Sequence, residues 1–151
     1  MIREKIELLQ EELTGLQLAA GHLEYSIERC LNLMGQEDIP PDQLERLESL
    51  TSRFARLADL LIQRIFRLID EIELTSVGTI LDRIYRAEKR GWVDASEMIK
   101  IRELRNLIAH EYSNDKMSEI YAAVISLSPS LLVAVPRVIA YANDLIRRYP
   151  E

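Results

Sequence analysis

The chain of 151 residues has little of what sheets, disulfide bonds and zinc sites require. Five glycines and five prolines leave little material for the many turns of a sheet-rich fold. The single cysteine, Cys30, excludes an internal disulfide bond and provides no zinc signature, as expected in a reducing cytosol. The chain is instead rich in leucine, isoleucine, glutamate and arginine, a composition that favours helices.

Targeting and membrane signals are also missing. Residues 1–5 do not have the basic-then-apolar form of a signal peptide, and the longest fully apolar runs are too short to span a bilayer. The net charge of −6 argues against a protein that coats nucleic acid through bulk electrostatics, although a small local basic site remains possible. We therefore expect a soluble, cytoplasmic protein.

Hydrophobic periodicity predicts an all-α fold. Residues 2–34 carry apolar side chains at alternating spacings of three and four, which is an unbroken helical seam. Four further helices are expected. The second begins after Pro41 and ends at about Thr75, the third covers about 77–89, the fourth runs from Asp94 towards His110, and the last covers about 116–148. The apolar face of the second helix widens at residues 60–66, so this part should pack against two neighbours.

Two prolines and one long seam leave details of this bundle open. Pro129 and Pro136 each remove a backbone donor, so we expect the last helix to be kinked or split. The prediction is one domain over residues 1–151, a compact up-and-down bundle of five helices, or six if Pro129 breaks the last one. The apolar seam of the first helix either packs along the second helix over its full length or contacts a second subunit with part of its length. We expect a homodimer.

One polar cluster stands out, the octet RNLIAHEY at residues 105–112. Arg102, Asn106 and His110 follow at spacings of four, so they form one row on a helix, and Asn106 lies between Arg105 and His110. The sequence Ser-Asn-Asp at 113–115 interrupts the helical pattern. This interruption could bring Tyr112 to the same side of the helix.

The chemistry of this cluster suits phosphate. Histidine exchanges a proton near neutral pH, arginine offers a fork of donors to phosphate oxygens, and asparagine can orient either group. No carboxylate pair, metal-ligand cluster or nucleophilic triad accompanies them, which fits cleavage of RNA by its own 2′-hydroxyl. A solvated helix end, with His110 beside the negative end of the helix dipole, explains the same residues. The residues alone leave both interpretations open.

The octet resembles the motif of the HEPN superfamily, Arg-x4-His with a polar residue directly after the arginine. The tyrosine two residues after the histidine resembles the Arg-x4-His-x-Tyr form of HepT-type toxins. Segments 53–59, 81–91 and 101–106 also look like a small bacterial HepT-like family. The resemblance covers residues 45–115 in detail and the whole chain in its expected helical architecture.

This resemblance implies a ribonuclease toxin that uses no metal or cofactor and dimerises so that both motifs line one cleft. Arg105 would stabilise the phosphate in the transition state, His110 would be the acid and base, and Asn106 would support them. In HepT-type systems a nucleotidyltransferase antitoxin of the MNT type attaches AMP to the motif tyrosine, which corresponds to Tyr112. Arg102, Arg53 and Arg56 are candidates to extend the RNA-binding surface.

Alternatives remain at the level of the sequence. The chain could be a non-catalytic HEPN module that binds a nucleotide or a nucleotidyltransferase, or a plain helical scaffold. We expect His22 to be structural and Trp92 to pack a turn. Asp59 and Asp82 either anchor the motif arginines or cap helices at the surface.

Overall fold

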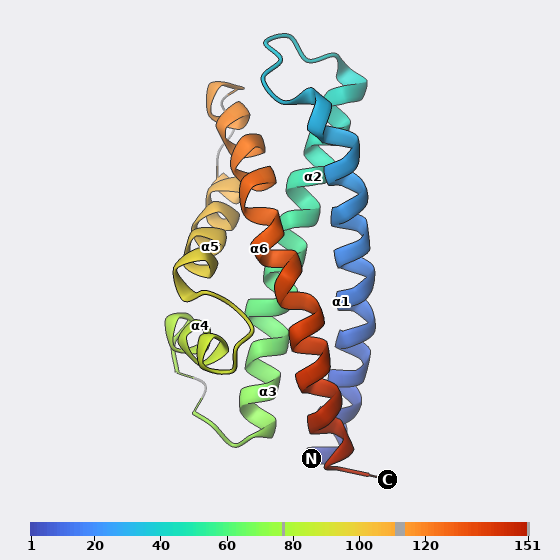
Figure 1. Cartoon of the computed structure of the whole chain (residues 1–151), viewed down its shortest axis with the longest axis vertical. Coiled ribbons are helices and arrows are strands. Elements are labelled where there is room, and N and C mark those ends of the chain that lie inside the picture. Colours follow the sequence, from blue (N-terminus) through green and yellow to red (C-terminus); the bar gives the residue numbers. More distant parts are fainter. Residues whose placement is uncertain (77, 111–113, 151) are drawn as a thin grey trace.

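The structure is a computed structural model that describes residues 1–76, 78–110 and 114–150. All its regular elements are helical within these ranges, which confirms the all-α prediction (Figure 1). The helices are α1 (Ile2–Cys30), α2 (Pro41–Asp59), α3 (Phe66–Ile72), α4 (Ile80–Lys89), α5 (Ala95–His110) and α6 (Asn114–Arg147). A short 3-10 turn, Leu31–Leu33, follows α1. A π turn, Leu60–Ile65, joins α2 to α3, so the described chain forms five helical rods, as predicted.

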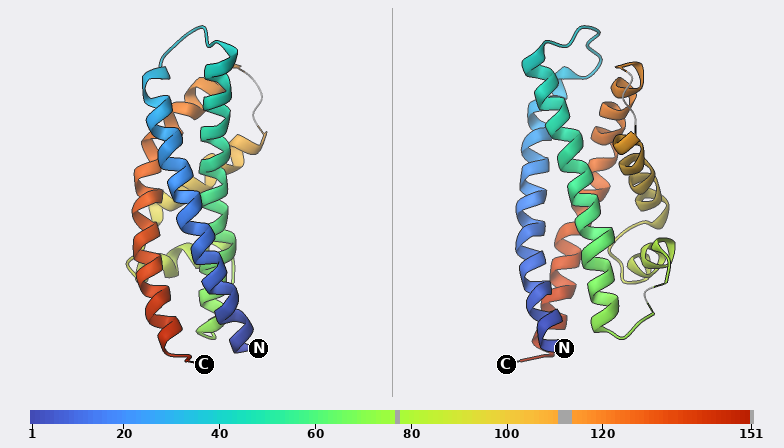
Figure 2. Two further views of the ribbon diagram at one scale, coloured as in Figure 1. Left: turned by 90° about the vertical axis from the view of Figure 1, so that its right-hand side faces the viewer. Right: turned by 180° about the vertical axis from the view of Figure 1, so that it is seen from behind.

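Three rods run along the length of the bundle and two lie on one side of it. Figures 1 and 2 show α1, the α2–α3 rod and α6 side by side, with the shorter α4 and α5 on the same flank. The chain begins and ends at the same end of the bundle. There Nη2 of Arg3 donates to the carbonyl oxygens of Tyr149, at 2.9 Å, and Pro150, at 2.7 Å.

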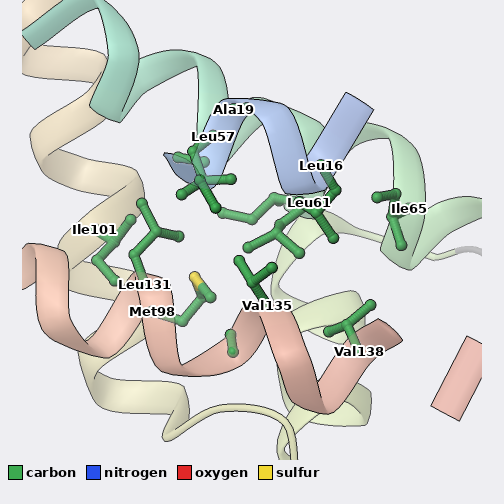
Figure 3. Close-up of a cluster of buried hydrophobic side chains, with 14 of the residues drawn as sticks. Leu16, Ala19, Leu57, Leu61, Ile65, Met98, Ile101, Leu131, Val135 and Val138 are labelled. Atoms are coloured by element: carbon green, nitrogen blue, oxygen red, sulfur yellow. The ribbon is translucent and has the colours of Figure 1, made fainter. Parts of the chain in front are cut away.

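The predicted seam of the first helix forms one side of the core. Leu9, Leu16 and Leu23 are fully buried, and α1 packs mainly along α2. Each such burial contributes roughly 1.5–3 kcal/mol to stability. Figure 3 shows this core where side chains from α1, α2, the π turn, α5 and α6 meet. Since α2 covers the seam, its length does not by itself require a second subunit.

The π turn accounts for the wide apolar face that the sequence shows there. Leu61, Ile62 and Ile65 are all buried, and the turn packs against both α1 and α4, which confirms the prediction of two neighbours. The carbonyl oxygen of Ile62 accepts a hydrogen bond from Nη1 of the buried Arg83, at 3.2 Å. This hydrogen bond connects the backbone of the π turn to α4.

The last helix passes through both of its prolines. α6 is continuous from Asn114 to Arg147, so of the alternatives that the sequence left open, a split at Pro129 does not occur. The residues around the prolines are held by the core: Leu131 and Val135 are buried, and the hydroxyl of Ser128 donates to the carbonyl of Val124 at 2.6 Å. Packing on this scale offsets the backbone hydrogen bond that a proline removes.

Residues 116–147 of α6 are long and apolar enough to cross a membrane, judged by length and composition alone. About a third of the most apolar 18-residue window, 33%, is buried inside the bundle. Core helices of soluble proteins meet the same criterion. In this structure α6 packs against α1, α2 and α5.

A buried ionic network fastens α4 to α3 and α6. Asp70 is fully buried; one carboxylate oxygen accepts from Nε and Nη2 of Arg86, at 3.0 and 2.7 Å, and the other accepts from Nη1 of Arg90 at 2.8 Å. Arg90 also donates to Glu73 at 2.9 Å, and Glu73 accepts from the hydroxyl of Tyr141 at 2.7 Å. Burial alone would lower the pKa of Arg90, but its hydrogen bond to Asp70 and the nearby carboxylates raise it.

Trp92 packs the turn between α4 and α5, as predicted. Its ring lies 5.4 Å from that of Phe66 and 5.0 Å from that of Tyr141, and the residue is 2% exposed. The guanidinium of Arg90 lies 5.1 Å from the Trp92 ring centroid. Two members of the ionic network, Arg90 and Tyr141, thus contact the turn that leads into α5.

Candidate functional site

The central feature of the candidate site is an ion pair between α5 and α2. Nε of Arg105 donates to Oδ1 of Asp59 at 2.7 Å, and Nη2 donates to Oδ2 at 2.9 Å. The two side chains are 34% and 39% exposed. The hydrogen bond to Asp59 raises the pKa of Arg105, against a smaller opposing effect of burial. Two parallel hydrogen bonds fix the orientation of a guanidinium as well as its charge.

The two aspartates that the sequence left open have different roles. Asp59 anchors the motif arginine, Arg105. Asp82 instead caps α4, where it accepts from the backbone nitrogen of Thr79 at 2.9 Å, while the Thr79 hydroxyl accepts from the Asp82 nitrogen at 3.1 Å. The start of α5, where the sequence predicts a helix from Asp94, is capped by this residue: its Oδ1 accepts from the nitrogen of Ser96, at 2.9 Å.

The ion pair leaves part of Arg105 available. A guanidinium has five N–H bonds, and Asp59 accepts two of them. Within the described residues Asp59 is the only hydrogen-bond partner of the Arg105 side chain. The remaining three N–H bonds include a fork formed by Nη1 and Nη2, which matches the spacing of two phosphate oxygens.

Two hollows meet at this ion pair, and both have the size of small-ligand sites. The first hollow has a volume of about 450 Å³ and is lined by Ser52, Ala55, Arg56, Asp59, Leu60, Arg64, Arg105, Ile108 and Ala109. The second hollow has a volume of about 350 Å³ and is lined by Ala58, Asp59, Ile62, Gln63, Ile80, Arg102, Arg105 and Asn106. Asp59 and Arg105 belong to both, so the pair forms the wall between them.

The hollows carry positive charge on an acidic protein. Four arginines and one aspartate line them, a local excess of three positive charges on a chain with a net charge of −6. Among the described residues Arg56 and Arg102 have no ion-pair partner, and the 66% exposed Arg64 reaches only Glu12, at 3.6 Å. This local excess favours an anionic ligand.

The structure brings most of the predicted site residues together but leaves the histidine at the edge. Arg102 and Asn106 line the second hollow, and Arg56 lines the first. His110 is exposed at the last position of α5 and lines neither hollow. Five residues along an α-helix correspond to about 7.5 Å and a rotation of about 140°, so Arg105 and His110 point in different directions. Tyr112 lies outside the described residues.

Arg53 does not join this cluster. Its Nη1 donates to the carbonyl of His22 at 3.1 Å and to the hydroxyl of Ser26 at 2.7 Å, which fastens α2 to α1. It borders a separate shallow hollow with Glu45, Glu48, Ser49 and Ser52. The side chain of His22 itself is exposed.

Sequence reasoning did not single out Arg64 and Gln63, which line the first and second hollow. Both residues belong to the π turn, which gives two residues to each hollow: Leu60 and Arg64 to the first, and Ile62 and Gln63 to the second. No pattern of residue types in this chain marks a π turn.

No group of three or more histidine, cysteine or acidic side chains is placed to hold a metal ion in the part of the chain that the structure describes. No protein-family model, curated protein or solved structure matches this chain. The arrangement around Arg105 is therefore interpreted from its own chemistry: a fixed cation, spare N–H donors, and two hollows with an excess of positive charge.

Proposed function

We propose that this protein is a HepT-like toxin of a toxin–antitoxin system, a metal-independent endoribonuclease that acts in the cytoplasm. One observation supports this most: Asp59 holds Arg105 where two arginine-lined hollows meet on an otherwise acidic chain. Asn106 and His110 follow on the same helix, but Arg105 and His110 point in different directions, so Arg105 and Asn106 line the hollows while the imidazole lies at their edge.

The proposed reaction is transesterification within RNA. The 2′-hydroxyl of a ribose attacks the adjacent phosphorus and the bond to the 5′-oxygen of the next nucleotide breaks, which leaves a 2′,3′-cyclic phosphate and a 5′-hydroxyl. One proton leaves the 2′-oxygen and one is added to the 5′-oxygen, and His110 exchanges both. Arg105 donates its free N–H bonds to the non-bridging oxygens as negative charge grows. Asn106 supports the phosphate or the imidazole.

A homodimer completes this proposal. Since His110 and Arg105 of one chain point in different directions, a second α5 across a shared cleft would supply an imidazole on the other side of the phosphate. A nucleotidyltransferase antitoxin of the MNT type would inhibit the enzyme by attaching AMP to Tyr112. A bulky anionic adduct next to the cleft would exclude RNA by its volume and its charge.

The test is expression in a bacterial host together with RNA cleavage by the purified protein in EDTA. Wild type should slow growth and cleave RNA, while Arg105→Ala and His110→Ala should do neither. Arg147→Gln, an exposed arginine near the chain termini, is the matched control and should behave as wild type. Equal growth of all four strains, with no RNA cleavage in EDTA, would refute the proposal.

The antitoxin is tested by intact mass. Protein co-expressed with a nucleotidyltransferase encoded by a neighbouring gene should gain the mass of AMP. Tyr112→Phe should abolish the gain and leave RNA cleavage intact. An unchanged mass of the wild-type protein, or a gain that survives in Tyr112→Phe, contradicts the proposed modification.

A second function is favoured by the position of His110. Because this residue lines neither hollow, the same surface suits a non-catalytic module that binds a nucleotide or a nucleotidyltransferase. Tight binding of a nucleotide or of the nucleotidyltransferase by wild type, together with no RNA cleavage at any protein concentration that saturates this binding, would establish this alternative.

A further inference from the structure

The two hollows beside the Asp59–Arg105 pair differ in their chemistry. The first adds the guanidinium groups of Arg56 and Arg64 and the hydroxyl of Ser52 to Arg105. These are all donors of hydrogen bonds to phosphate oxygens. The first hollow is therefore suited to phosphate groups.

The second hollow contains the side-chain amides. Gln63, from the π turn, and Asn106, from α5, line it together with Arg102. An amide both donates and accepts hydrogen bonds, which is the pattern that reads the edge of a nucleobase. Apolar side chains complete the lining, and Ile80 is only partly buried, so it offers a surface on which a flat base can rest.

We propose that one nucleic-acid strand crosses the Asp59–Arg105 pair, with a base in the second hollow and neighbouring phosphates in the first. Arg105 touches both hollows, so its free N–H bonds lie where base and phosphates join. This assignment rests on the proposed function in one respect, that the phosphate at Arg105 is the one cleaved. Binding in this arrangement does not require cleavage.

The arrangement selects a class of ligand. A base that enters the second hollow and contacts the amides of Gln63 and Asn106 must be unpaired, because pairing occupies its Watson–Crick edge and the major groove of an RNA duplex is too deep and narrow for side chains. The ligand is therefore a single strand with a preferred base at one position. Phosphate contacts in the first hollow add affinity without regard to sequence.

The two hollows are tested with labelled single-stranded 2′-O-methyl RNA hexamers, which transesterification cannot cleave. Four hexamers with one varied base are titrated by fluorescence anisotropy at several salt concentrations. Wild type should bind one hexamer best. Arg56→Gln/Arg64→Gln should weaken all four by at least about tenfold and reduce the slope of log affinity against log salt by about 1.4, or 0.7 for each lost contact.

Gln63→Ala should have the opposite signature. Because it removes an uncharged group, the slope against salt should stay as in wild type. The preference for the best base should fall by about tenfold, the value of one good base contact. Arg147→Gln is the control for charge and should match wild type in slope and preference.

Three results would overturn the inference: equal affinity of wild type for all four hexamers, an unchanged salt slope in Arg56→Gln/Arg64→Gln, or an unchanged base preference in Gln63→Ala. The proposed function fails separately. If these binding signatures hold but unmodified RNA stays intact in EDTA, the two subsites stand and the ribonuclease does not. If unmodified RNA is cleaved in EDTA but any of the three overturning results is found, the ribonuclease stands and the two subsites do not.

Discussion

Among the described residues, Asp70 and Asp59 each pair with an arginine of another helix, and the two aspartates occupy contrasting environments. Asp70 is fully buried between α3 and α4, and both of its oxygens are taken by Arg86 and Arg90. Asp59 is 39% exposed, pairs only with Arg105 among the described residues, and lies among arginines that it does not neutralise. The first arrangement balances its charges inside the fold, whereas the second leaves a positive surplus at a hollow.

This difference separates a structural network from a candidate site. A buried carboxylate must keep its partners, since an uncompensated charge in the interior is costly. A half-exposed pair contributes little to stability, because water screens it. The Asp59–Arg105 pair is therefore better explained by the orientation that it gives to the Arg105 guanidinium than by a contribution to the stability of the fold.

The largest expected effect is on stability, from Asp70→Ala. This change leaves Arg86 and Arg90 without their common buried carboxylate, and it should lower the free energy of unfolding by about 3–5 kcal/mol. Urea unfolding followed by circular dichroism measures this. Asp144→Ala, which removes an exposed pair with Arg147, should stay within about 0.5 kcal/mol of wild type. A loss below about 1 kcal/mol for Asp70→Ala would remove the contrast between the two pairs.

Asp59→Ala should show the reverse pattern. The free energy of unfolding should change by about 0.2–1 kcal/mol, because the pair is exposed. The value of kcat should fall by about 10-fold to 100-fold, because Arg105 loses its orientation. The KM for RNA should not rise, since one negative charge has been removed from the hollows.

Asp59→Glu is the matched variant that keeps the carboxylate and should restore part of kcat. The role of Asp59 as a positioning residue is contradicted if Asp59→Ala keeps the wild-type kcat. It is also contradicted if kcat is lost only in proportion to unfolding.

The smallest expected effect is the dependence of stability on acid. The hydroxyl of Ser96 and the backbone of Glu97 lower the pKa of Asp94, and the Thr79 backbone and hydroxyl lower that of Asp82. A carboxylate with a lowered pKa stabilises the fold above its unfolded pKa of about 3.9 and loses this contribution as the pH falls through the folded pKa. The Tm should therefore decline on acidification below about pH 4.

The matched variant is Asp82→Asn/Asp94→Asn, which keeps an oxygen acceptor at each cap but cannot titrate. Its Tm should depend less on pH than that of wild type below about pH 4. Parallel curves for the two proteins would show that these caps do not set the acid dependence.

Much of the fold could be predicted because it follows from local periodicity. The seam of α1, the cap at Asp94 and the turn packed by Trp92 are all visible in residue type and spacing. The continuity of α6 through Pro129 could not be predicted, because it depends on contacts with distant helices. The Asp70 network could not be predicted for the same reason, because its members come from three different helices.

The candidate site was predicted in part. The octet at 105–112 indicated Arg105 and Asn106, and Arg56 and Arg102, two of the candidates for an RNA-binding surface, line the hollows beside them. The roles of Asp59 and Arg53 depend on which helix faces which, so spacing along the chain could not decide them. Arg64 and Gln63 reach the hollows through the π turn.

The most direct test of the central claim is the chemistry of the RNA ends. Wild-type protein should cleave single-stranded RNA in EDTA and leave a 2′,3′-cyclic phosphate and a 5′-hydroxyl, detected by mass spectrometry. A single 2′-deoxy nucleotide at the cleaved position should stop the reaction, and Arg105→Ala should produce neither end. Intact RNA after incubation with folded wild-type protein, or the same ends produced equally by Arg105→Ala, would contradict the account.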